Sequence, residues 1–198
     1  RGLGDVYKRQ MSGITATGST VLSGLDTMTP GILMWRSMLH WLGGIGFIGM
    51  AVAILPLLRI GGMRLFQTES SDRSEKVMPR SHMVARLIVA TYVSITILGS
   101  LAFWWAGMSV FDAINHAMSA ISTGGFSTSD QSLAKWTQPA VHWVAIVMMI
   151  LGSLPFTLYV ATLRGHRKAL FKDQQVQGLL GLLVVTWFVM GTWMWWTT

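Results

Sequence analysis

Four long apolar stretches dominate this sequence and limit what it can fold into. They cover residues 31–58, 84–108, 139–163 and 176–196, and their only Lys, Arg, Asp or Glu residues are Arg36 and Arg86. Each is long enough to cross a hydrocarbon layer of about 30 Å, which takes about 20 helical residues. Because lipid offers the backbone no hydrogen-bond partners, the sequence predicts an all-α polytopic membrane protein surrounded by lipid.

The basic residues predict how the chain is oriented. They gather in 59–86 and 164–175, whereas 109–138 carries only Asp112, Asp130 and Lys135. Cytoplasmic loops are enriched in Lys and Arg, so we expect the two basic loops to be cytoplasmic and 109–138 to face the other side. The same clustering accounts for the net charge of +7 without a nucleic-acid partner. The chain has no cysteine, which excludes disulfides and thiolate metal sites.

The segment between the second and third apolar stretches is not an ordinary loop. Apolar residues at helical spacing predict a helix over 110–121, with Asp112 in its first turn. At 1.5 Å per residue this helix is about 18 Å long, too short to span a membrane. An uncharged stretch, "STGGFS" (122–127), follows it. The order fits either a re-entrant pore loop or an extracellular amphipathic helix followed by a Ser/Gly loop.

An internal repeat favours the pore loop. The stretch "MSGITATGST" (11–20) aligns without gaps with "MSAISTGGFS" (118–127), which begins 107 residues later. The alignment pairs Gly18 with Gly125, whereas Thr17 stands opposite Gly124. It indicates one span–loop–span unit used more than once. We expect serine at Gly18 and at Gly125 to have similar effects, and threonine at Gly124 to have a milder one.

Both copies have the composition of a filter for a dehydrated cation. Rings of backbone carbonyls can replace the water around a potassium ion, and glycine reaches the left-handed torsions that turn carbonyls inward. The helix over 110–121 would direct its negative end at the same place. Hydroxyl side chains would stabilise the backbone. The predicted potassium ligands are Thr15, Ala16, Thr17, Gly18, Ser122, Thr123, Gly124 and Gly125.

Other polar residues have simpler interpretations. Asp112 and His116 lie four apart on one helix face but lack a third ligand or base, so we interpret them as a structural hydrogen-bonded pair. We expect no catalytic residue and no cofactor; an intramembrane enzyme using this pair is the alternative. Arg36 either snorkels to the interface or contacts a pore helix or a carboxylate. We interpret His40 as an interfacial anchor.

Three longer motifs carry a family resemblance. They are "SGITATGSTVLSGLD…WRSMLHWLGGIGFI", "AVAILPLLRIGGMRLF" and "AGMSVFDAINHAMSAISTGGFSTSD". With these motifs the chain resembles the Trk/Ktr/HKT superfamily of potassium transporters, and its TrkH-type membrane subunits most closely. The resemblance implies a fragment of a pore made of four span–pore helix–span repeats, in a bacterial inner membrane. It further implies potassium as the transported ion, a homodimer, and a cytoplasmic nucleotide-binding regulatory subunit of the TrkA type on the basic loops.

The resemblance also divides the chain. Residues 1–10 carry Arg1, Lys8 and Arg9 where the repeat predicts an apolar pore helix, so we expect a tail foreign to the family. The other predicted parts are the end of the first pore loop with its second span (11–58), a cytoplasmic loop (59–83), a complete second repeat with its filter at 122–126 (84–163), a cytoplasmic loop (164–175), and the first span of the third repeat (176–198).

Overall fold

The structure, a computed structural model, describes residues 3–19, 22–58, 77–165 and 169–197. Every regular element in these ranges is a helix, which confirms the all-α prediction. The chain forms two units, residues 1–153 and 154–198. Of the cytoplasmic loop predicted over 59–83, residues 59–76 lie outside the described residues, whereas 77–83 form the first two turns of a helix that runs from Val77 to Trp105.

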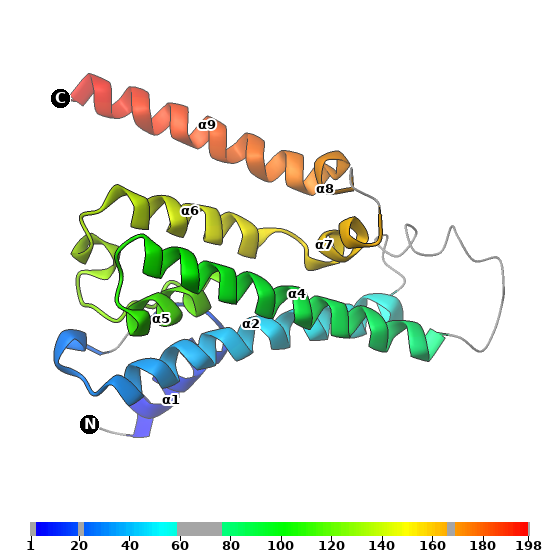
Figure 1. Ribbon diagram of the computed structural model, residues 1–198, viewed down its shortest axis with the longest axis horizontal. Helices are drawn as coiled ribbons and strands as arrows, with labels where there is room; N and C mark the ends of the chain where they lie inside the picture. The colour runs from blue at the N-terminus through cyan, green and yellow to red at the C-terminus, as the bar shows by residue number, and fades with distance from the viewer. Residues whose placement is uncertain (1–2, 20–21, 59–76, 166–168, 198) are drawn as a thin grey trace. The chain divides into compact units, whose positions relative to one another are not determined.

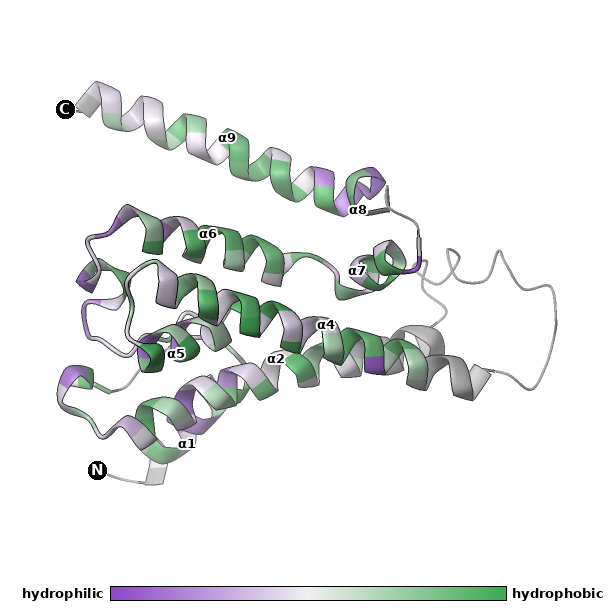
Figure 2. Ribbon diagram, viewed as in Figure 1, coloured by the Kyte–Doolittle hydropathy of each residue, from purple (hydrophilic) through white to green (hydrophobic). Residues whose placement is uncertain are grey.

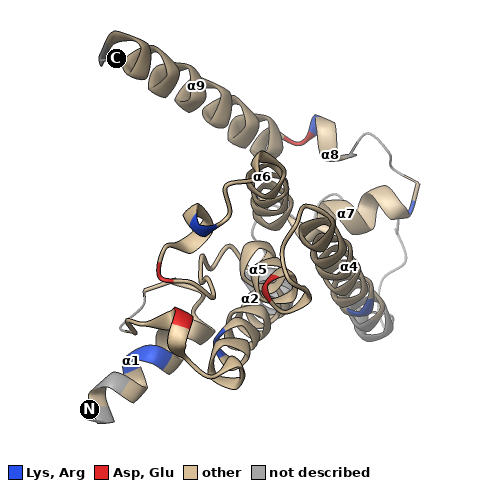
Figure 3. Cartoon of the chain, turned by 60° about the vertical axis from the view of Figure 1, so that its left-hand side comes forward, with Lys and Arg blue, Asp and Glu red and all other residues tan. Residues whose placement is uncertain are grey.

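The first unit is built around one short helix. Helix α5 (Val110–Ile121) packs against three longer helices, and α1 (Leu3–Ile14) packs against one of them. Figure 3 shows α5 with α2, α4 and α6 around it. The longer helices are α2 (Pro30–Leu58), α4 (Val77–Trp105) and α6 (Pro139–Ser153), and two 3₁₀ turns, η1 (Leu25–Thr27) and η3 (Ser132–Lys135), lie in the connections (Figure 1).

Helix α5 occupies the range that the apolar spacing predicts. Its first turn is capped by Ser109, whose hydroxyl accepts a hydrogen bond from the backbone N–H of Asp112 at 3.1 Å. Residues 115–119 are all buried, although an amphipathic helix on a surface would expose one face in each turn. The helix is therefore enclosed by the spans, as a pore loop requires.

Glycines let two spans approach the ends of the short helices. A β-carbon at Gly43 of α2 would collide with the main-chain carbonyl of Ile14, and one at Gly152 of α6 with that of Ile121. Ile14 and Ile121 are paired by the internal repeat. The repeat seen in the sequence is thus also a repeat of packing.

Two of the predicted spans meet the length and hydropathy expected of membrane helices. Within the described residues these are Met83–Trp105 in α4 and Gln174–Trp196 in α9, with a third if α6 and α7 together form one broken span. Figure 2 shows the apolar character of α4, α6 and α9. Helix α2 has 29 residues but is not one of these two spans. Its first part carries the buried polar residues Arg36 and His40.

The second unit contains α7 (Phe156–Leu163), α8 (Ala169–Lys172) and α9 (Gln174–Thr197). Leu154, Leu158 and Val176 form its small core. The carboxylate of Asp173 caps α9 by accepting hydrogen bonds from the N–H groups of Gln175 and Val176 at 2.9 and 3.2 Å. Much of α9 is apolar and exposed, as a helix surrounded by lipid or by other protein would be.

Candidate selectivity filter

Both predicted filter segments have the same unusual backbone. Gly18 and Gly125 have φ angles of 73° and 79°, so the left-handed torsion expected at the paired glycines is present. Two residues earlier, Ala16 and Thr123 also have positive φ, 51° and 53°. Left-handed torsions strain residues with a β-carbon, and their recurrence at paired positions marks a shared geometry. The sequence did not indicate Ala16 or Thr123 as left-handed, because neither is glycine.

Each segment begins by capping the helix before it. The N–H groups of Ala16 and Thr17 donate to the carbonyls of Gly13 and Ser12 at 3.1 and 3.2 Å. In the second copy, Thr123 and Gly124 donate to Ala120 and Ser119 at 3.0 and 2.9 Å. This is the Schellman pattern, which satisfies the last carbonyls of a helix through a left-handed residue. The caps therefore orient the donors of both segments toward their helices.

The carbonyls of the two segments have no such partners. Across the part of the chain that the structure describes, no hydrogen bond is donated to a carbonyl of residues 15–18 or 122–125. Thr15, Thr17, Thr123 and Gly125 are exposed, and only Ser122 and Gly124 among these residues are buried. Eight main-chain oxygens are thus available to a hydrogen-bond donor or to a cation.

The two segments lie next to one another. A β-carbon at Gly18 would collide with the main-chain carbonyl of Gly124, so only glycine fits at position 18. Residues 106 positions apart in the chain therefore meet at the point where both segments carry their free carbonyls. The structure brings the predicted filter residues together into one site.

Hydroxyl groups stabilise the segments largely as predicted. Thr15 donates to the carbonyl of Met11 at 2.6 Å and shares a hydrogen bond of 2.7 Å with the Thr17 hydroxyl. Ser122 donates to the carbonyls of Met118 and Ser119 at 2.9 and 3.1 Å. Thr123 makes no hydroxyl hydrogen bond with any described residue, so the prediction fails at that residue.

Asp112 and His116 support the chain just after the second segment. Thr128 donates to one carboxylate oxygen of Asp112 at 2.6 Å, and Ser109 donates to the other at 2.7 Å. The Nδ1 of His116 lies 2.8 Å from the main-chain carbonyl of Asp112, which can only accept, so Nδ1 carries the proton. Its Nε2 then accepts from Ser127 at 2.9 Å.

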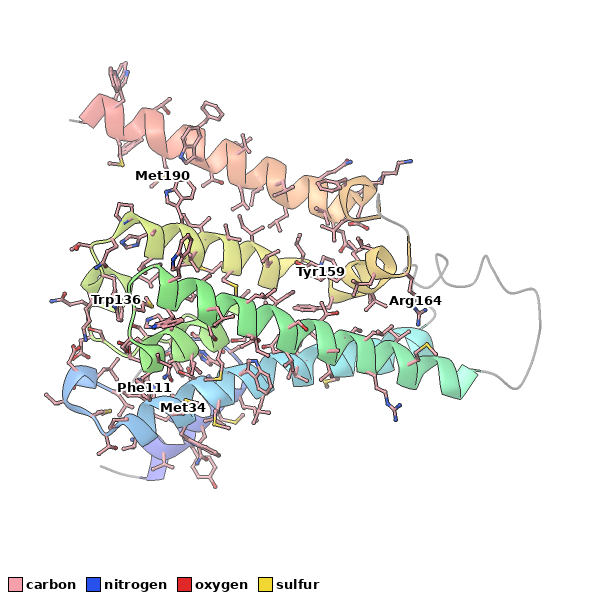
Figure 4. All side chains as sticks on the ribbon, viewed as in Figure 1. Met34, Phe111, Trp136, Tyr159, Arg164 and Met190 are labelled. Atoms are coloured by element: carbon pink, nitrogen blue, oxygen red, sulfur yellow. The ribbon has the colours of Figure 1, made fainter. Side chains whose placement is uncertain are left out.

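The predicted pair is therefore joined through the backbone of Asp112 and not through its carboxylate. The ring of Trp136, labelled in Figure 4, makes a T-shaped contact with the imidazole, with centroids 4.8 Å apart. Among the described residues, no group of three His, Cys, Asp or Glu side chains lies together in a way that could hold a metal ion. Both side chains are engaged in positioning residues 127–128.

Arg36 and His40 lie behind the second segment. Arg36 is 7% exposed, with its guanidinium carbon 4.3 Å from the centroid of the Phe126 ring, so it does not snorkel to the interface. His40 is fully buried and stacks on the same ring at 3.8 Å. The prediction of His40 as an interfacial anchor is wrong. His40 lies four residues after Arg36, a spacing that places both side chains on one helix face. This spacing was the sequence signal that could have linked the two residues.

The environment of Gly124 contradicts the milder effect predicted for threonine at this position. A β-carbon there would come within 2.7 Å of Cγ of His40 and closer still to Nδ1. Threonine cannot be accommodated unless the imidazole moves. The repeat alignment misled here because it compares segments but not the spans that pack against them.

Two loops, one following each predicted filter segment, contact one another. Asp26 accepts hydrogen bonds from the Ser129 hydroxyl at 3.1 Å and the Asp130 N–H at 3.2 Å, and pairs with Lys135 at 2.8 Å. These three contacts hold the pKa of Asp26 below its ordinary value, with Lys135 contributing most. The same pairing raises the pKa of Lys135.

Helix α1 continues across the border proposed for the tail. It runs from Leu3 to Ile14, so residues 3–10 and the start of the first copy form one helix. Among residues 4–10 whose side chains are described, all but the half-buried Arg9 are exposed. The foreign origin of 1–10 stays a prediction.

Known proteins resemble this chain both in sequence and in fold. The protein TrkI of the Trk potassium uptake system of Halomonas elongata is 48% identical, over 92% of this chain and 37% of its own length. The corresponding TrkH of Vibrio parahaemolyticus is 38% identical, over 93% of this chain and 39% of its own length. The crystal structure of the potassium transporter TrkH from that organism superposes with a TM-score of 0.83 at 36% identity. This structural match covers 96% of this chain and 38% of the TrkH chain.

The chain thus spans between 37% and 39% of the length of these curated relatives. A family model described as "TrkH: Cation transport protein" matches residues 3–196, which is nearly the whole chain. With a match of this extent and a fold shared with a solved relative, the chain belongs to the TrkH family of cation transport proteins.

Proposed function

We propose that this chain supplies two pore loops to a potassium uptake protein, with residues 15–18 and 122–125 lining its selectivity filter. One observation carries the proposal. Eight main-chain carbonyls in two neighbouring segments are free of hydrogen bonds from described residues, beside paired left-handed residues. Carbonyl dipoles can replace the hydration shell of a potassium ion as it enters the pore.

The electrostatic environment of these carbonyls favours a cation but binds it weakly enough for the ion to leave again. Neither segment contains a carboxylate, so an ion meets dipoles and not a full negative charge. The carboxyl end of α5 adds the partial negative charge of a helix terminus close by. Potassium is the ion named for the relatives. Because this chain covers only part of their length, uptake belongs to the complete transporter.

The enzyme alternative has less support. Asp112 and His116 are its only candidates, and both are used in hydrogen bonds that hold residues 127–128. A general acid or base must be free to reach a substrate proton, whereas Nε2 of His116 already accepts from Ser127. The family description is also that of a transport protein.

The location and partners follow from the family resemblance and the charge pattern. We place the chain in a bacterial inner membrane, crossing it several times within a homodimer. A nucleotide-binding regulatory subunit of the TrkA type would dock on the basic loops over 59–86 and 164–175. Replacing Arg73, Lys76 and Arg80 by Glu should then weaken the association and change its salt response.

A matched pair of variants keeps that test specific. Neutralising Asp72 and Glu75 as Asn and Gln makes the same loop more positive and should strengthen the association at low salt. Binding that is the same for all variants in a pull-down across a salt series would exclude this loop as the docking surface.

Ion flux into vesicles tests the filter itself. The complete transporter, reconstituted into lipid vesicles, should take up rubidium, a potassium analogue, in clear preference to sodium. The variant Gly125→Ser should lose part of that preference at equal protein per vesicle. Equal rubidium and sodium flux through the wild type would contradict the proposal.

A further inference from the structure

We infer that His40 and Arg36, on the long helix α2 of the first repeat, are positioning residues for the filter segment of the second repeat. They act through the ring of Phe126, the residue directly after Gly125. The inference rests on the proposed filter function, because its consequence is a change in ion selectivity.

Phe126 is held by two side chains from one turn of α2. Its ring is 6% exposed and lies nearly parallel to the His40 imidazole, at 15° and 3.8 Å between centroids. The Arg36 guanidinium carbon lies 4.3 Å from the same centroid, within the range of a cation–π contact. Arg36 and His40 are themselves buried at 7% and 0% exposure. The contact is therefore shielded from water and salt.

His40 also contacts the second pore loop at two further places. Its imidazole fills the space beside Gly124, where an added β-carbon would come within 2.7 Å of Cγ. Its Nδ1 lies 3.4 Å from the hydroxyl of Ser119, near the end of α5. One side chain thus contacts the end of the pore helix, the filter segment and the residue that follows it.

These contacts explain a difference between the two repeats. The second copy has Gly124 beside the His40 imidazole, where the first copy has Thr17. Thr17 is exposed and uses its hydroxyl toward Thr15. Gly124 of the second filter segment is therefore required by a residue of the first repeat, His40.

The consequence is a coupling between the repeats. A site placed by packed side chains on a rigid helix keeps its geometry better than one on a free loop. When the imidazole is lost, residues 124–126 gain space, and their carbonyls can close around a smaller ion. Sodium should then pass more readily relative to rubidium.

A double-mutant cycle tests this in the complete transporter. The variants are His40→Ala, Gly124→Ala and their combination, with His142→Ala as the control because that half-buried histidine lies on α6. Rubidium and sodium flux into vesicles and the thermal midpoint in detergent are measured for each. His40→Gln, which keeps a polar side chain without the ring, replaces His40→Ala if the latter does not insert.

We expect His40→Ala to lower the rubidium-to-sodium ratio by about fivefold or more, within the coupling range of residues in contact. His142→Ala should leave the ratio unchanged. Gly124→Ala should lower the thermal midpoint, and the combination should recover part of that loss because the imidazole no longer blocks the β-carbon.

Two results would overturn the inference. One is a wild-type flux ratio in the His40 variant at equal insertion. The other is a combined variant no more stable than Gly124→Ala. A wild type that does not discriminate rubidium from sodium would instead reject the proposed filter, so the two failures are distinguishable.

Discussion

The Asp26 carboxylate accepts the backbone N–H of Asp130 at 3.2 Å, while the Asp130 carboxylate accepts the N–H groups of Gly24 and Leu25 at 3.1 and 3.0 Å. This reciprocal contact joins loops 104 residues apart, one following each filter segment. Two carboxylates that each satisfy backbone donors of the other loop fix the spacing of both loops. The loops that follow the two predicted filter segments are therefore held to one another.

Acid should loosen this contact. The pKa of Asp26 is lowered from 3.8, so its ionised form stabilises the loop pair above about pH 4, and this contribution is lost as the pH falls through the lowered pKa. Hydrogen exchange at residues 24–26 and 129–131 should accelerate on acidification after correction for the intrinsic rate. Asp26→Asn should show faster exchange already at pH 7. Asp173→Asn, which affects only the cap of α9, should leave these loops as protected as in the wild type.

The two paired glycines should differ when replaced by serine. At Gly125 the space for a β-carbon is open, and the left-handed torsion alone costs about 1–2 kcal/mol. Selectivity for rubidium over sodium should fall, and the thermal midpoint should fall only by this torsional cost. At Gly18 the same torsional cost is joined by a collision with the Gly124 carbonyl, so both selectivity and stability should fall. Equal thermal midpoints for the two variants would contradict the packing described here.

Thr128→Val should show what the support behind the second segment contributes. The hydroxyl is buried and donates to Asp112 at 2.6 Å, so its loss removes a hydrogen bond to a charged group, worth about 1.5–3 kcal/mol. We expect a lower unfolding free energy and a reduced rubidium-to-sodium ratio. Thr186→Val is the control, since that exposed hydroxyl bonds only within α9. If both variants unfold alike, Asp112 does not position residue 128.

Cysteine labelling should establish the predicted orientation. The chain has no cysteine, so single cysteines can be introduced at Arg73 and at the exposed Gln131 of a cysteine-free transporter. An impermeant thiol reagent added to intact cells should label position 131 and not position 73. Labelling of position 73 without membrane disruption would reverse the predicted topology.

The sequence alone determined the features that depend on local pattern. Apolar spacing and Asp112 in the first turn predicted the short helix that became α5, because both signals act within a few residues. The gapless repeat identified Gly18 and Gly125 as left-handed, since a residue without a β-carbon is the least strained choice there. The family resemblance indicated which segments form the pore loops.

Tertiary structure decided what surrounds those segments. His40 fills the space beside Gly124, and Asp26 binds the Asp130 backbone, through contacts between residues 84 and 104 positions apart. The left-handed torsions of Ala16 and Thr123 follow from helix caps, not from the identity of either residue. A residue's neighbours along the chain carry no information about which distant helix packs against it. Packing chose the partner of each polar side chain because a buried group must find one wherever the fold brings donors, acceptors and rings together.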